Sequence, residues 1–103
     1  MSRALRATAA SLLLTAGAAV AQDANLGRNL AATCANCHGT DGQVRGDAVK
    51  PLAGVPAAKI VAACNDFKSG AAPATIMHQI ARGFTDGQIQ AIAAYFAAQP
   101  AKK

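Results

Sequence analysis

The chain has 103 residues, of which 52% are hydrophobic, and its formal net charge is +5. Without Arg3 and Arg6, which lie in the N-terminal segment discussed next, eight basic and five acidic residues leave a net charge of only +3. Because this charge is small and aromatic residues make up only 4% of the chain, the composition argues against a nucleic-acid-binding protein.

Residues 1–21 are predicted to be an export signal. The two arginines precede an uncharged run from Ala7 to Val20, and Ala19-Val20-Ala21 supplies the small residues that a signal peptidase accepts. We therefore expect a signal peptide at 1–21, a mature domain at 22–103 in the periplasm, and no membrane span after cleavage. The alternative is an uncleaved membrane anchor, although the run is shorter than the roughly 20 residues of a typical span.

A first helix is predicted from Asp23, a favourable N-cap residue, to about Thr33. It leads directly into Cys34-Ala35-Asn36-Cys37-His38, the spacing typical of covalent haem attachment. In this interpretation Cys34 and Cys37 form thioethers to one haem c, and His38 binds the iron. A bound haem would also enlarge the core of a domain too small to be comfortably stable by apolar burial alone.

Two other interpretations of the cysteines are open. A zinc site could use Cys34, Cys37, Cys64 and His78, but the chain lacks the second closely spaced ligand pair that most structural zinc sites have. A thioredoxin-like dithiol site needs alternating strands and helices, and the sequence has no strand pattern.

A glycine-rich loop, Gly39 to Gly54, is predicted to follow the motif, and a second helix to begin near Pro56 and end before Gly70. The apolar stripe of this helix is Ile60, Cys64 and Phe67. Cys64 is expected to be a core side chain, because a free cysteine packs as a small apolar group. A disulfide to a partner, or binding of a soft metal such as copper, is the alternative.

A short turn of helix is predicted to open at Pro73 and to carry Met77, the only methionine after residue 21. We expect Met77 to be the second axial ligand of the iron, because a thioether stabilises the ferrous state. His78 is the rival ligand, with an exposed or docking role otherwise. Since adjacent helical residues point about 100° apart, Met77 and His78 cannot both face the iron. If neither did, the open iron would suit a haem enzyme or a sensor.

The last helix has the clearest start signal, a capping box of Thr85 and Gln88. Its inward stripe is Ile89, Ile92, Ala93 and Phe96, and Pro100 ends it. Gly27 is expected to let the first helix approach the last one at Tyr95 or Ile92. The prediction is an all-α fold, with three main helices and a short one around the haem.

Over Asp23 to Gln99 the sequence resembles the class I cytochromes c. The resemblance rests on Cys34-Ala35-Asn36-Cys37-His38-Gly39, Pro51-Leu52-Ala53-Gly54 and Ile92-Ala93-Ala94-Tyr95-Phe96. Three further stretches are similar to the cytochrome subunit of sulfide dehydrogenase, or flavocytochrome c: Asp66-Phe67-Lys68-Ser69-Gly70, Ala74-Thr75-Ile76-Met77 and Ile80-Ala81-Arg82-Gly83-Phe84-Thr85-Asp86.

The resemblance implies a small class I fold and a monohaem electron-transfer subunit without substrate chemistry of its own. It would accept electrons from an FAD-containing flavoprotein that oxidises sulfide, and pass them to a downstream redox protein. It also implies that the carbonyl of Pro51 accepts a hydrogen bond from the far ring nitrogen of His38. The alternative function is a free electron carrier for an oxidase or a photosynthetic reaction centre.

Overall fold

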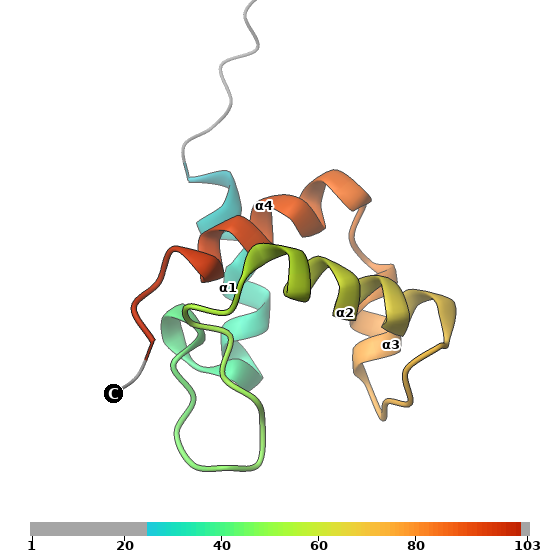
Figure 1. Cartoon of the computed structure of the whole chain (residues 1–103), viewed down its shortest axis with the longest axis horizontal. Helices are drawn as coiled ribbons and strands as arrows, with labels where there is room; N and C mark the ends of the chain where they lie inside the picture. The colour runs from blue at the N-terminus through green and yellow to red at the C-terminus, as the bar shows by residue number, and fades with distance from the viewer. Residues whose placement is uncertain (1–24, 102–103) are drawn as a thin grey trace, which may run out of the picture.

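The computed structural model describes residues 25–101, which form four α-helices and one short 3-10 turn, with no strand among them. In chain order these are α1 (Leu26–His38), η1 (Thr40–Gly42), α2 (Ala57–Ser69), α3 (Met77–Arg82) and α4 (Asp86–Ala97), as Figure 1 shows. The all-α prediction, with three main helices and a short one, is therefore confirmed. The proposed export signal and Asp23 lie outside the described residues.

Helix α1 is longer than predicted. It does not end near Thr33 but continues through the cysteine motif to His38. No glycine or proline interrupts the stretch from Leu30 to His38, so nothing in it opposes helix formation. The helix ends at Gly39, which has a φ of 84° and whose amide donates a hydrogen bond to the Ala35 carbonyl over 3.0 Å.

The predicted bounds of α2 and the predicted start of α4 are confirmed, while α4 ends at Ala97, three residues before Pro100. Pro56 is the N-cap residue of α2, and Gly70 ends it in the left-handed conformation. In α4 the Gln88 amide donates to the Thr85 hydroxyl over 3.2 Å, and the Thr85 amide donates to the Gln88 side chain over 2.9 Å. Both hydrogen bonds of the capping box are thus present.

Helix α3 begins four residues later than the predicted start at Pro73. The chain from Ala71 to Ile76 forms bends and has no regular secondary structure, and Ile76 has a non-helical φ of −138°. The β-branched side chains of Thr75 and Ile76 disfavour an earlier start. As a consequence, Met77 becomes the first residue of the helix.

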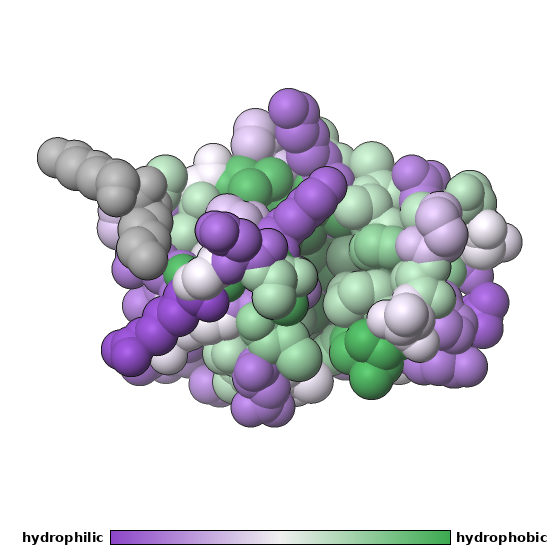
Figure 2. Space-filling model, turned by 90° about the horizontal axis from the view of Figure 1, so that it is seen from below, coloured by the Kyte–Doolittle hydropathy of each residue, from purple (hydrophilic) through white to green (hydrophobic). Residues whose placement is uncertain are grey.

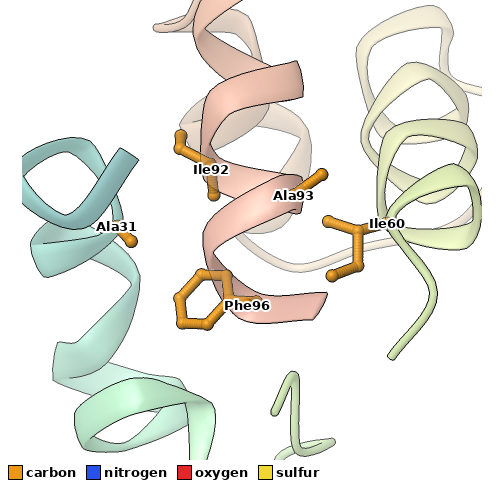
Figure 3. Close-up of a cluster of buried hydrophobic side chains, with 5 residues drawn as sticks. All are labelled: Ala31, Ile60, Ile92, Ala93 and Phe96. Atoms are coloured by element: carbon orange, nitrogen blue, oxygen red, sulfur yellow. The ribbon is translucent and has the colours of Figure 1, made fainter. Parts of the chain in front are cut away.

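The core lies where α4 passes between α1 and α2, as Figure 3 shows. Helix α4 contributes Ile92, Ala93 and Phe96, while α1 contributes Ala31 and α2 contributes Ile60. Three of the four inward residues predicted for α4 belong to this cluster, and the fourth, Ile89, is also buried.

Gly27 permits the close crossing of α1 and α4. A Cβ atom at this position would lie 2.6 Å from the Ala91 carbonyl oxygen and 3.2 Å from the Cβ of Tyr95. This contact with Tyr95 confirms the predicted approach. The crossing fixes the position of α1, and with it the cysteine motif at the other end of the same helix.

Candidate haem-attachment site

The last two turns of α1 carry Cys34, Cys37 and His38. Cys34 and His38 are four residues apart and Cys37 is three residues after Cys34, so the helix gathers the three side chains at one end. Cys34 is half-buried against the core cluster, and Cys37 is exposed. Neither cysteine forms a disulfide. Both sulfurs can therefore serve in covalent attachment of a cofactor.

The orientation of His38 is set by a backbone carbonyl of the following loop. Its Nδ1 lies 2.7 Å from the carbonyl oxygen of Lys50. Because a carbonyl only accepts hydrogen bonds, Nδ1 carries the proton, and the lone pair of Nε2 is free to bind a metal. This is the tautomer that iron ligation requires.

The predicted acceptor, the Pro51 carbonyl, is therefore wrong by one residue. The proline ring restricts the residue before it to extended conformations, which limits the directions that the Lys50 carbonyl can take. Any influence of Pro51 on His38 therefore passes through the backbone of Lys50 rather than through its own carbonyl.

Helix α3 is held against the end of α2 by hydrogen bonds from two cationic side chains. The Lys68 ammonium donates to the Phe84 carbonyl over 2.5 Å, and Arg82 Nε donates to the Lys68 carbonyl over 3.3 Å. Lys68 also lies 3.5 Å from the carboxylate of Asp86, which is largely exposed, so this ion pair adds little stability. These hydrogen bonds position α3, and with it Met77.

Met77 and His78 are both half-buried at the start of α3. Of the exposed or docking role expected for His78, the exposed part is wrong, because its Nδ1 is buried and has no hydrogen-bond partner among the described residues. A docking role stays a prediction. Helical geometry turns the side chains of Met77 and His78 about 100° apart, so only one of them can face the candidate haem site.

Cys64 packs against the core cluster, as its place in the apolar stripe predicted. Burial raises the pKa of this thiol, and the nearby Lys68 partly offsets the rise. Burial also raises the pKa of the Cys34 thiol, and the neighbouring Cys64 raises it further. This proximity of Cys34 and Cys64 was not predicted, because it depends on how α2 packs rather than on either local pattern.

The underside of the molecule has an apolar hollow. Figure 2, viewed from below Figure 1, shows hydrophobic surface on both walls of a depression near the centre. In Figure 1, the lower end of α1 and the loop that follows it lie to one side of this underside, and α3 lies to the other. Such a hollow suits a large apolar disc, and the two cysteines outside any disulfide and the Nε2 of His38 fit the attachment of a haem.

The zinc alternative gains no support. Residues 25–101 contain no group of three or more histidine, cysteine, aspartate or glutamate side chains placed to hold a metal ion.

Among residues 25–101, no helix combines the length and the apolar character needed to cross a membrane.

Comparisons with known proteins agree with this site. The cytochrome c family model matches residues 24–99. The chain is 39% identical over 70 residues to the cytochrome subunit of sulfide dehydrogenase of Chlorobaculum tepidum. This match covers 68% of this chain and 63% of that subunit. It is 34% identical over 82 residues to cytochrome c-554(548) of Halomonas halodenitrificans, covering 77% of this chain and 99% of that protein.

A third relative, the thiosulfate dehydrogenase electron acceptor of Stutzerimonas stutzeri, is 39% identical over 67 residues, covering 62% of this chain but only 31% of that protein. The chain thus spans less than two thirds of the sulfide dehydrogenase subunit and of this acceptor. The match to the family model extends over all five helical elements, and the chain therefore belongs to the cytochrome c family, as an electron-transfer protein with one covalently bound haem c.

Proposed function

We propose that Cys34 and Cys37 would hold the haem of this cytochrome, and that His38 and Met77 would be the protein ligands of its iron. The observation that carries the proposal is the hydrogen bond from His38 Nδ1 to the Lys50 carbonyl, which leaves Nε2 free for the metal. When bound, the haem supplies a reversible one-electron change between ferric and ferrous iron. The chain contributes the two ligands, their orientation and an apolar surrounding.

The assignment of Met77 is supported by its place as the first residue of α3, the helix that lies across the underside of the molecule from the lower end of α1. A thioether there would raise the reduction potential above that of a site with two imidazoles. Lys68 and Arg82 hold α3 against α2, so the ligand would move little when the iron changes its oxidation state.

Two alanine variants test the sixth ligand. Met77→Ala should give high-spin ferrous protein that binds carbon monoxide rapidly, together with a lower reduction potential. His78→Ala is the matched control, because it truncates the adjacent half-buried side chain, and it should leave the native spectrum unchanged. The reverse pattern would identify His78 as the iron ligand instead of Met77. An unchanged spectrum in both variants would refute a ligand from α3.

We further propose that the electrons come from an FAD-containing flavoprotein that oxidises sulfide. The similarity to a cytochrome subunit of sulfide dehydrogenase supports this donor, and a downstream redox protein would be the acceptor. In the test, sulfide should reduce the purified cytochrome only when the flavoprotein is present, and the two chains should elute together in gel filtration.

A free electron carrier is the second candidate function. It is favoured by cytochrome c-554(548), nearly all of whose length is matched by this chain. A free carrier would elute alone from a fresh extract and would not be reduced by sulfide with the flavoprotein. It would instead exchange electrons with an oxidase or a photosynthetic reaction centre.

We also propose that residues 1–21 direct export to the periplasm and are then removed. Intact mass and N-terminal sequencing of the protein from the periplasmic fraction should show a chain that begins at Gln22 and carries one haem. A full-length chain recovered from the membrane fraction would instead identify the segment as an anchor.

A further inference from the structure

The loop between α1 and α2 is tied to α4 by a side-chain hydrogen bond. The hydroxyl of Tyr95, on α4, donates a short hydrogen bond to the Asp41 carboxylate in η1. This bond raises the pKa of Tyr95, as do partial burial and the negative charge of Asp41, while Arg28 opposes the rise. The phenol therefore keeps its proton near neutral pH and acts as a hydrogen-bond donor.

Asp41 is held in an unusual backbone conformation. It has a φ of 56°, and it is the only residue other than glycine with a positive φ between positions 25 and 101. Aspartate adopts this left-handed conformation more readily than most residues, but the conformation still has an energetic cost. The hydrogen bond from Tyr95 helps to offset that cost, so the two residues stabilise this turn together.

The turn stabilised in this way joins the two arms of the loop. The carbonyl of Gly42, the residue after Asp41, accepts hydrogen bonds from the amides of Leu52 over 3.0 Å and Ala53 over 3.2 Å. Gly42 is buried, and a Cβ atom there would lie 2.6 Å from the Ala53 nitrogen. The far arm of the loop is therefore positioned by the conformation of the near arm.

The far arm also carries the carbonyl that orients the histidine. Lys50 is two residues before Leu52, and its carbonyl accepts the hydrogen bond from His38 Nδ1. Two hydrogen-bonded contacts therefore connect Tyr95 to the acceptor of His38. Tyr95 binds Asp41, and the adjacent Gly42 carbonyl binds the arm of the loop that carries Lys50.

We propose that Asp41 and Tyr95 are positioning residues for His38, which hold the Lys50 carbonyl in place and thereby tune the electron donation of the imidazole to the iron. This inference rests on the proposed role of His38 as an axial ligand. A firmly held carbonyl makes the imidazole more electron-rich, which favours ferric iron and lowers the reduction potential. Loosening the turn should have the opposite effect.

Two conservative variants of the haem-loaded protein test the proposal. Tyr95→Phe removes the donor but keeps the ring that packs edge-on against Phe96. Asp41→Asn keeps a residue that tolerates a positive φ, but replaces the charged acceptor with a weaker neutral one. Each should make exchange of the His38 Nδ1 proton with solvent about tenfold faster, because the acceptor is lost more often through local opening. Each should also raise the reduction potential.

Gln99→Ala is the matched control. The Gln99 side chain donates to the Tyr95 carbonyl over 2.9 Å, so this variant removes a hydrogen bond at the end of α4 without touching Asp41. It should lower thermal stability but leave proton exchange and the potential unchanged. The double variant of Asp41 and Tyr95 should show little effect beyond that of either single one, because both remove the same hydrogen bond.

Proton NMR of the ferric protein separates the outcomes. If Tyr95→Phe and Asp41→Asn lower thermal stability as Gln99→Ala does, with unchanged exchange and potential, their role is structural only and the inference is overturned. If the ring protons of His38 show no paramagnetic shift in the native protein, His38 is not an iron ligand, and the proposed function fails with the inference.

Discussion

The crossing of α1 and α4 at Gly27 offers the sharpest test of the packing, and Gly27→Ala is the change that tests it. The added Cβ would lie 2.6 Å from the Ala91 carbonyl oxygen, about 0.8 Å closer than ordinary van der Waals contact begins. Because the nearest atom belongs to the backbone of α4, no side chain can rotate away to make room. The two helices would have to separate.

The expected cost follows from two opposing terms. Inserting a methyl group into a tight contact costs about 1–3 kcal/mol, whereas replacing glycine by alanine within a helix contributes at most about 1 kcal/mol. We therefore expect a net loss of about 1 kcal/mol. For a domain of this size, such a loss corresponds to a fall in melting temperature of about 4–8 °C.

Gly87→Ala is a closely matched control, since Gly87 is also the second residue of its helix and its added Cβ would have no atom within 4 Å apart from its chain neighbours and the backbone of its own helix. The assay is thermal unfolding of both haem-loaded variants, followed by far-UV circular dichroism. Gly27→Ala should melt below the native protein, and Gly87→Ala at or above it. If Gly27→Ala melted at the native temperature or higher, the close crossing of α1 and α4 would be refuted.

Three further predictions concern other parts of the fold. Thr85→Ala should cost about 1 kcal/mol in urea unfolding by removing the acceptor of the Gln88 amide, whereas an equal loss in Thr85→Ser would contradict a capping role. Because the pKa of Tyr95 is raised in the folded state, the stabilisation by its bond to Asp41 is complete below about pH 10 and lost as the pH rises further. The native protein should therefore lose its stability advantage over Tyr95→Phe above that pH, and a constant difference in urea midpoint would contradict this linkage. Cys64 is half-buried and its pKa is raised, so its alkylation by iodoacetamide should be at least about tenfold slower in the folded haem protein than in urea-unfolded protein. Cys64→Ser is the unlabelled control, and equal rates would contradict a thiol packed against the core.

Helix faces were predictable from the sequence, but the end of α1 and the start of α3 were not. The inward positions of α4 follow from its 3.6-residue period, and its start follows from the local chemistry of Thr85 and Gln88. The end of α1 was placed too early, although only Gly39 carries a stop signal. The start of α3 was placed too early because Pro73 permits a helix without requiring one.

In the candidate site, too, features set by local sequence were predictable, and features set by the path of the backbone or by distant contacts were not. The motif that contains Cys34 and Cys37 could be recognised because its spacing is local. The acceptor of His38 was predicted one residue too late, since the direction of a loop carbonyl depends on backbone angles that the sequence does not specify. The hydrogen bond between Tyr95 and Asp41 spans 54 positions, so no local pattern could indicate it.

The closing helix explains why these distant contacts matter for electron transfer. Helix α4 packs on α1 at Gly27, and the Phe96 carbonyl accepts a hydrogen bond from the Gly54 amide over 2.9 Å at the far end of the loop. Its first turn lies beside Lys68, whose ammonium also fixes the segment that follows α3. The motif, the loop that orients His38, and α3 are thus all attached to one capped helix. Ligands held in this way need little rearrangement when the iron gains or loses an electron. The capping box that starts α4 therefore stabilises the helix on which the positions of both proposed ligands depend.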